Sequence, residues 1–172
     1  MVVYINRHFE DEAMNSAQRQ EAAAQERRER KRAADLLARA ERDELDAAWE
    51  ALLDKPVIQP VRGPETGLVM VRGRIGGGGS PFNLGEVTVT RATVKLASGA
   101  IGHAHALGTD RDKVRLAAIF DALWHQPATK EFVEKAILLP VTDRIAEYDR
   151  KRAEQTAATR VDFFTMVRGE DK

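Results

Sequence analysis

The chain has 172 residues and no cysteine, which excludes disulfides, cysteine-ligated zinc, iron–sulfur ligation and a cysteine nucleophile. It also lacks an excess of either charge, because 27 Lys and Arg residues balance 27 Asp and Glu residues. A net charge of zero gives no overall electrostatic attraction for nucleic acid. There is no signal-peptide pattern and no apolar run long enough to span a bilayer. We therefore expect a cytoplasmic protein that contacts neither nucleic acid nor membrane.

The length fits one domain, or one domain with an appendage. The first sixteen residues do not match the rest of the chain, because a short apolar patch from Val2 to Ile5 leads into an acidic stretch, and Met14 could be the true start. We expect residues 1–16 to be a disordered or misassigned extension. Residues 17–172 then form a single domain, with a tail over residues 160–172.

Helical patterns flank the centre of the chain. The first is rich in Ala, Glu, Gln and Arg, and the others carry apolar stripes at helical spacing. Asp43 and Asp110 are suitable N-caps, and Pro140 is a suitable first residue for the last helix. Helices are expected over residues 17–40, 43–53, 110–124, 129–138 and 140–158.

A basic cluster lies in the first of these helices, from Arg27 to Arg32. Glu26 and Glu29 are interleaved with it and can form local ion pairs. Nucleic-acid binding is an alternative, but no aromatic residues accompany the cluster. A solvated helix face is therefore the favoured interpretation.

The centre of the chain predicts an antiparallel sheet. Several prolines between residues 56 and 64 indicate a loop, and strand patterns begin at Leu68. A second strand covers residues 86–96, where a change in apolar parity implies a bulge near Thr90 or cover on both faces. We expect an α+β fold, with a small antiparallel sheet of three or four strands. The N-terminal and C-terminal helices pack on one side of it, and an extended apolar tail comes last.

Two histidines lie on the third expected strand. A two-residue turn at Ser98-Gly99 would place His103 opposite Val94 and His105 opposite Ala92. Histidines two apart on one strand face have the geometry of a metal pair, but they need a further ligand. Because this register points them at an apolar surface, packed and hydrogen-bonded histidines are the favoured interpretation, and we assign no metal ligand.

Asp121 lies within the apolar face of its helix, and a carboxylate there needs a partner, for which Arg91 or Arg74 could serve. We interpret Asp121 as structural rather than catalytic. No Ser-His-Asp order, close carboxylate pair or nucleophile elbow is present. The sequence therefore predicts no catalytic residue.

The glycine run from Gly76 to Gly79 could wrap a phosphate with its backbone N–H groups. It is not a nucleotide-binding P-loop, since Pro81 and a strand come where Lys, Ser or Thr and a helix are needed. Arg72 and Arg74 flank it and could bind a phosphonate or triphosphate bidentately. The alternative is that they pair with carboxylates of a neighbouring chain.

The tail is unusual for a chain end, because residues 160–169 contain two Phe, one Met and two Val directly after a charged helix. Aromatic residues, Met and Arg are enriched at protein interfaces. The tail could fold back on its own domain. We favour a partner anchor, with Arg160, Asp162, Phe163, Phe164, Met166 and Arg168 as interface residues.

Three segments and the tail together resemble the PhnG family, the G subunit of bacterial carbon–phosphorus lyase. The segments are residues 65–77 with 81–86, residues 88–96 with Gly99, and the pair Leu107-Gly108. They occur in the family's order and spacing, and the similarity covers about residues 30–169.

The resemblance implies a non-catalytic subunit of a core complex with PhnH, PhnI and PhnJ subunits, two copies of each, and transient PhnK and PhnL ATP-binding-cassette proteins. That complex transfers an alkylphosphonate onto the ribose of ATP and releases adenine. It uses S-adenosylmethionine and an iron–sulfur cluster through another subunit, so no cofactor is expected on this chain. The alternative is an enzyme in its own right that uses Arg72, Arg74 and the histidine strand.

Overall fold

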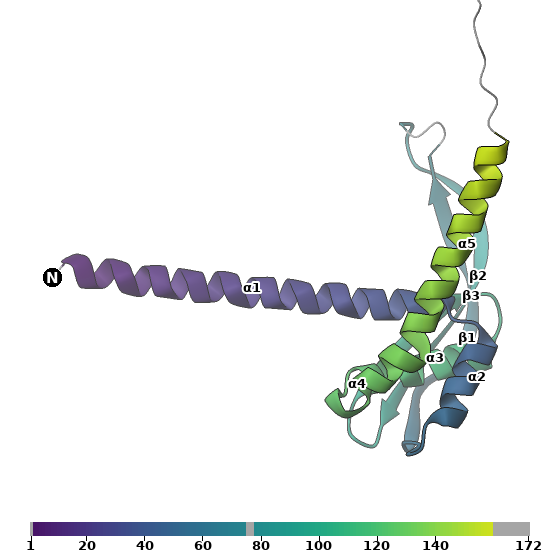
Figure 1. Ribbon diagram of the computed structural model, residues 1–172, viewed down its shortest axis with the longest axis horizontal. Coiled ribbons are helices and arrows are strands. Elements are labelled where there is room, and N and C mark those ends of the chain that lie inside the picture. The colour runs from purple at the N-terminus through teal and green to yellow at the C-terminus, as the bar shows by residue number, and fades with distance from the viewer. Residues whose placement is uncertain (1, 75–77, 160–172) are drawn as a thin grey trace, which may run out of the picture.

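The computed structural model describes residues 2–74 and 78–159 (Figure 1). It has the expected α+β architecture, with one long helix projecting from a body in which helices cover a sheet. In chain order the elements are α1 (Val2–Arg39), α2 (Arg42–Ala51), β1 (Ile58–Gly73), β2 (Phe82–Leu96), β3 (Ile101–Leu107), α3 (Arg111–Trp124), α4 (Pro127–Val133), the π-helical turn η1 (Glu134–Leu138) and α5 (Leu139–Ala158).

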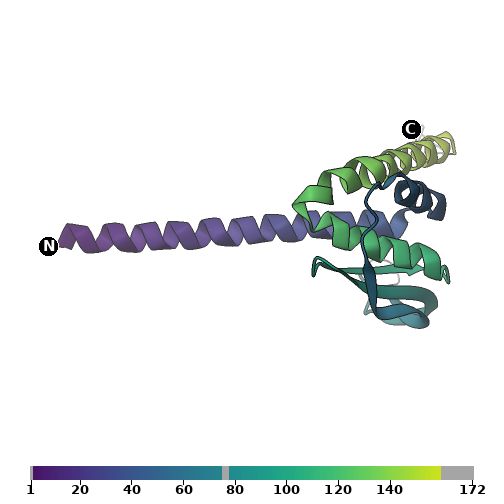
Figure 2. The same cartoon turned by 90° about the horizontal axis from the view of Figure 1, so that it is seen from below.

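The three strands form an antiparallel sheet in the order β1-β2-β3, and α3 lies against one face of it. Figure 2 shows the layers, with α3 between the sheet and the outer helices, and no helix below the opposite face. The even-numbered residues of β2 from Thr90 to Leu96 point toward α3 and are buried, which accounts for the apolar pattern of Ala92, Val94 and Leu96. The prediction of helices on one side of the sheet is confirmed.

The register between β2 and β3 differs by one residue from the predicted one. The hairpin closes with a three-residue loop, in which Gly99 has a φ of 90° and Leu96 N–H donates to the Ala100 carbonyl at 2.8 Å. Three-residue hairpin loops commonly end on such a left-handed glycine. His103 therefore lies opposite Thr93, and His105 lies opposite Arg91. A shift of one residue moves every side chain to the other face, so the prediction of histidines packed on an apolar surface is wrong.

The predicted loop before Leu68 is also wrong, because β1 begins at Ile58 and includes Pro60 and Pro64. Proline lacks the N–H that a central strand needs, but β1 is an edge strand and can accommodate it. Its register shifts between Pro60 and Arg62 and again between Arg62 and Glu65, opposite residues 91–94 of β2. The irregularity predicted near Thr90 and Arg91 thus occurs in the neighbouring strand.

The N-terminal helix is longer than expected, since α1 continues without interruption through residues 2–16. The helical conformation of residues 2–16 differs from the disorder that we expected there. The division into an extension, residues 1–16, and a domain, residues 17–172, stays a prediction. Among the side chains of α1 that the structure describes, residues 18–39, the buried ones are Ala33 and Leu37, close to its C-terminal end. Most of the described side chains before Ala33 are exposed, and Figure 1 shows this part of α1 standing away from the body.

The helices after α3 form one continuous run rather than two, and Pro140 lies inside it rather than at its start. Proline in a helix interior removes a main-chain donor and crowds the preceding turn. The π-helical turn η1 lies directly before it, and such turns change the hydrogen-bond spacing locally. The run therefore passes Pro140 without breaking.

Arg144 joins three helices. Its Nε and Nη2 atoms contact Glu44 at 2.8 and 3.0 Å, and Nη2 also donates to the Arg39 carbonyl at 2.9 Å. Glu44 accepts in addition from the backbone N–H of Glu41 at 2.7 Å, as part of a capping box. The N-cap of α2 is therefore Glu41, not the predicted Asp43. This junction fixes α5 against the C-terminal end of α1 and the start of α2.

The Glu44 junction should make the stability depend on pH in the acid range. Desolvation is the largest single influence on the pKa of Glu44 and raises it. The hydrogen bonds from Arg144 and Glu41, with the positive charges of Arg144 and Lys113, together outweigh it, so the pKa lies below its ordinary value. The charged pair then stabilises the fold above the unfolded-state pKa, and this stability is lost as the pH falls through the folded pKa. Glu44→Gln keeps an acceptor but not the charge, and should cost about 1 kcal/mol near pH 7.

Urea unfolding of the wild type and of Glu44→Gln at pH 7 and near pH 3 measures this effect. The difference between the two free energies of unfolding should shrink at the lower pH. A difference that is equal at both pH values would show that the charge of Glu44 does not stabilise the junction.

Candidate functional site

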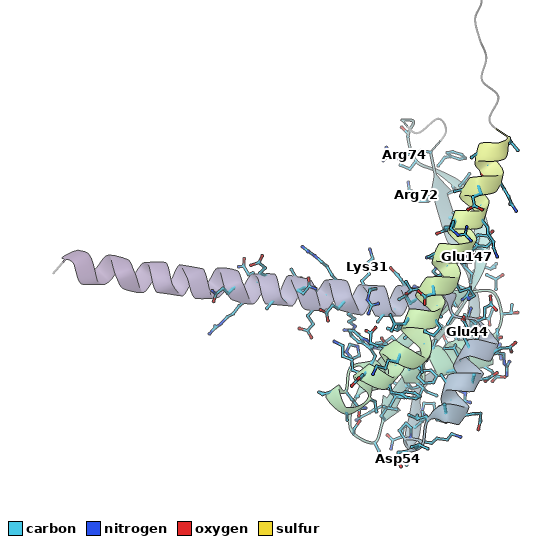
Figure 3. All side chains as sticks on the ribbon, viewed as in Figure 1. Lys31, Glu44, Asp54, Arg72, Arg74 and Glu147 are labelled. Carbon is cyan, nitrogen blue, oxygen red and sulfur yellow. The ribbon has the colours of Figure 1, made fainter. Side chains whose placement is uncertain are left out.

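Arg72 lies near the end of β1, and Arg74 directly follows the strand. Both side chains are exposed, and Figure 3 shows them near the tip of the β1–β2 hairpin, at the opposite end of the body from Asp54. The ion pairs of β1 lie further down the strand, where Glu65 contacts Arg62 at 3.5 Å and Arg91 at 3.3 Å. Within the described residues, neither Arg72 nor Arg74 forms an ion pair. The two guanidinium groups are thus available to an anion or to a partner's carboxylates.

The two arginines and the two histidines are not brought together. Arg72 of β1 lies opposite Asn83 of β2. His105 of β3 lies opposite Arg91, which is eight positions further along β2. At about 3.3 Å per residue this separation is roughly 26 Å. A single small ligand could not contact both sets, so the combined arginine and histidine site of the alternative interpretation does not form in this chain.

His103 and His105 share the sheet face that α3 does not cover, and both are exposed. His103 contacts Thr93, with 3.0 Å between Nδ1 and Oγ1. In residues 2–74 and 78–159, no group of three or more His, Cys, Asp or Glu residues is placed to hold a metal ion.

Asp121 is buried, but neither Arg91 nor Arg74 is its partner. Its Oδ2 accepts from the backbone N–H of His103 at 2.8 Å, and His125 Nε2 lies 3.8 Å from Oδ1. Because β3 is an edge strand, the carboxylate supplies an acceptor that no further described strand provides. The arrangement supports the structural interpretation of Asp121, because its carboxylate accepts a hydrogen bond from the main chain of β3.

A shallow hollow of about 450 Å³ lies where α1, β3 and α3 meet. Its charged lining residues are Arg39 and Lys113, which lie beside His105 and the apolar Val89 and Leu107. The hollow contains no carboxylate or hydroxyl group among its lining residues. It can attract an anion, but its lining has no hydroxyl, thiol or carboxylate nucleophile and no paired acid and base with which to catalyse a reaction.

Two of the predicted sites lie partly or wholly outside the described residues. Gly76 and Gly77 of the glycine run lie outside the described residues, and so does the whole tail with the six interface residues predicted from the sequence. Their roles stay predictions.

The sequence reasoning missed a large exposed apolar surface on the β1–β2 hairpin. Leu68 and Leu84 are 65% and 61% exposed, and Val69, Met70 and Phe82 are also exposed. The signal was present in the consecutive apolar residues 68–71, which cannot all point to one face of a strand. A strand with apolar residues at both parities needs cover on both faces. The described part of the chain supplies none at this end of the hairpin.

Among the described residues, no helix combines the length and the apolar character needed to cross a bilayer.

Comparison with known proteins gives two consistent matches. The family described as "Phosphonate metabolism protein PhnG" matches residues 28–169. A curated protein of Rhizobium meliloti (strain 1021), named "Alpha-D-ribose 1-methylphosphonate 5-triphosphate synthase subunit PhnG", is 61% identical over 151 residues. That alignment covers 88% of this chain and 94% of the relative. The similarity therefore extends over nearly the whole of both chains rather than over one motif.

Proposed function

The chain belongs to the PhnG family of phosphonate metabolism proteins, and from this membership we propose that it is an accessory subunit of α-D-ribose 1-methylphosphonate 5-triphosphate synthase. The observation that carries the proposal is the 61% identity to a protein named as that subunit, over 94% of its length. The reaction attaches an alkylphosphonate to the ribose of ATP and releases adenine. The chain's part is to hold the catalytic subunits in a productive assembly.

The partners in this proposal are PhnH-, PhnI- and PhnJ-type subunits, two copies of each, with PhnK- and PhnL-type ATP-binding-cassette proteins binding transiently. ATP is a substrate of the whole complex. S-adenosylmethionine and the iron–sulfur cluster belong to another subunit and a later step, so this chain holds no cofactor. The complex works in the cytoplasm, where ATP is available. Arg72 and Arg74 are proposed to contact either a phosphate group or a partner's carboxylate.

The geometry of the described residues supports an accessory role rather than independent catalysis. The tip arginines and the strand histidines are separated along β2, and the basic hollow has no hydroxyl, thiol or carboxylate nucleophile among its lining residues. A hairpin with exposed apolar residues on both faces suits a subunit that is covered by others.

Adenine release tests the proposal directly. The host's other synthase subunits are incubated with ATP and methylphosphonate, with and without this chain, and free adenine is measured by chromatography. We expect release that depends on the chain and no release by the chain alone. Adenine release at an equal rate without the chain would overturn the accessory role, and turnover by the chain alone would favour an enzyme in its own right.

A further inference from the structure

The distal part of the β1–β2 hairpin, called the arm here, consists of residues 68–73 of β1, Arg74 directly after them, and residues 82–88 of β2. It lies beyond the end of β3, whose pairing with β2 stops at Leu107 and Val89. Figure 1 shows the arm rising above the rest of the sheet, and Figure 2 shows α5 on the far side of the helical layer from the sheet. The arm is therefore two strands wide, and two-stranded hairpins alone are only marginally stable in water.

The base of the arm is held firmly. Thr90 is fully buried, and its Oγ1 donates to the Gly108 carbonyl at 2.7 Å while lying 3.0 Å from Oγ1 of Thr66. This network joins β1, β2 and the end of β3 where the arm begins. The arm thus projects from a fixed point rather than from a flexible connection.

Both faces of the arm are apolar and exposed. Leu68 and Met70 point to one face, with exposed fractions of 65% and 47%, and Val69 points to the other with 50%. Leu84 lies near the tip, and its side chain packs over Gly73. A surface that docks flat against a partner needs one apolar face only. Apolar residues on both faces favour a setting that encloses the arm.

No further strand among the described residues pairs with the edges of the arm. β1 is an edge strand along its whole length, and β3 does not reach residues 82–87 of β2. The last hydrogen bond to this edge of β2 comes from the Gly108 N–H, which donates to the Thr88 carbonyl at 2.9 Å. The main-chain groups on these edges can hydrogen-bond to the walls of an enclosing partner.

The tip of the arm is basic. Arg72 and Arg74 are exposed there (Figure 3), without an ion pair among the described residues, whereas the acidic residue of the arm, Glu86, lies further toward the base. A cationic tip on an apolar stem disfavours insertion into the hydrocarbon of a membrane, since arginine is costly there. It favours a protein whose carboxylates meet the tip.

We propose that the arm inserts into a cleft of another synthase subunit, with apolar walls and carboxylates at its closed end. This inference rests on the proposed function, because it takes the partner to be a subunit of the same assembly. Leu68, Val69, Met70 and Leu84 contact the walls, and Arg72 and Arg74 pair with the carboxylates.

The absence of cysteine allows a direct test, since a Leu68→Cys variant carries one labelling site. It is labelled with an environment-sensitive fluorophore and titrated with the other synthase subunits. The matched control is Leu53→Cys, because Leu53 is an apolar residue that is 97% exposed but lies outside the arm. We expect a blue shift for the arm label on assembly and none for the control. Two arm variants are compared with the wild type: Met70→Asp, and the double variant that carries both Arg72→Glu and Arg74→Glu. Their affinity for the other subunits in co-purification should fall about tenfold or more, whereas the control variants Leu53→Asp and Arg28→Glu should bind as the wild type does.

The outcomes separate this inference from the proposed function. If the wild-type chain does not bind the other subunits, the proposed function fails. If it binds but the arm label and both arm variants behave as the controls do, the arm inference alone is wrong. A shift that appears in the isolated chain as its concentration rises would identify a second copy as the occupant. A shift with lipid vesicles alone would identify a membrane, and either result would overturn the proposal.

Discussion

Replacement of Gly102 by alanine is expected to destabilise the fold by about 3 kcal/mol, near the upper end of the usual cost of an inserted methyl group. A Cβ atom at Gly102 would collide with the Ala118 carbonyl oxygen and would lie 2.5 Å from the backbone nitrogen of Ala122. Both are main-chain atoms of α3, so no side-chain rotation can relieve the contact. The whole helix would have to move away from the sheet.

The same movement would disturb the buried Asp121, whose hydrogen bond to the His103 N–H depends on the close approach of α3 and β3. Thermal unfolding measures the effect, and for a chain of this size about 3 kcal/mol corresponds to a fall in Tm of roughly 6–12 °C.

Gly67→Ala is the matched control for Gly102→Ala, because Gly67 lies in β1 and a Cβ there would meet no atom within 4 Å. Its Tm should stay close to that of the wild type. If the Tm of Gly102→Ala also lies within about 2 °C of that of the wild type, the close packing of α3 on β3 contributes much less to the free energy of unfolding than about 3 kcal/mol.

Deletion of residues 160–172 is expected to abolish co-purification with the partner subunits and to leave the domain folded. The buried hydrophobic residues of the described chain extend from Ala33 to Val141, so the core is built before the tail begins. The tail's two Phe, one Met and two Arg residues are of the kinds enriched at interfaces. Affinity capture and thermal unfolding of the truncated chain measure the two parts of the prediction.

A shorter truncation that removes only Glu170, Asp171 and Lys172 is the control for the tail deletion. It removes charged residues but keeps the apolar segment, and it should capture the partners as the full chain does. Full capture by the chain that lacks residues 160–172 would show that the tail is not an anchor. A loss of the unfolding transition in that chain would show instead that the tail folds onto its own domain.

The fold class could be predicted because the helical stripes and the strand patterns are local properties. The apolar stripe of Leu116, Ile119, Phe120 and Leu123 predicts α3, and Asp110 caps it as expected by accepting from Lys113 N–H at 2.9 Å. The stripe does not predict that α3 is buried nearly all round. That burial arises because the sheet lies on one side and other helices lie on the other, which is a property of the whole fold.

The register of the histidine strand could not be predicted with the same security. The segment Ala97-Ser98-Gly99 is compatible with a two-residue or a three-residue loop, and the choice decides which face His103 and His105 occupy. The strand at Pro60 and Pro64 was missed for a similar reason. A proline-containing strand is tolerated at the edge of a sheet, and the edge position is known only once the sheet order is known.

The candidate interaction surface was only partly accessible from the sequence. Arg72 and Arg74 stand out because they flank the glycine run, and they lie exposed at the tip of the arm. The consecutive apolar residues 68–71 indicate a strand that needs cover on both faces, but they do not show what covers it. The hairpin extends past the end of β3, and no local pattern around residues 68–71 encodes that these side chains are exposed on both faces.

Co-expression of the tagged chain with the host's PhnH-, PhnI- and PhnJ-type subunits tests the central claim most directly. The eluate is sized by chromatography with light scattering, and the subunits are quantified in each fraction. An accessory subunit should elute in one multi-subunit particle with all partners in stoichiometric amounts. Elution as a stable monomer, with none of the three partners bound, would contradict the claim that this chain acts as part of the synthase assembly.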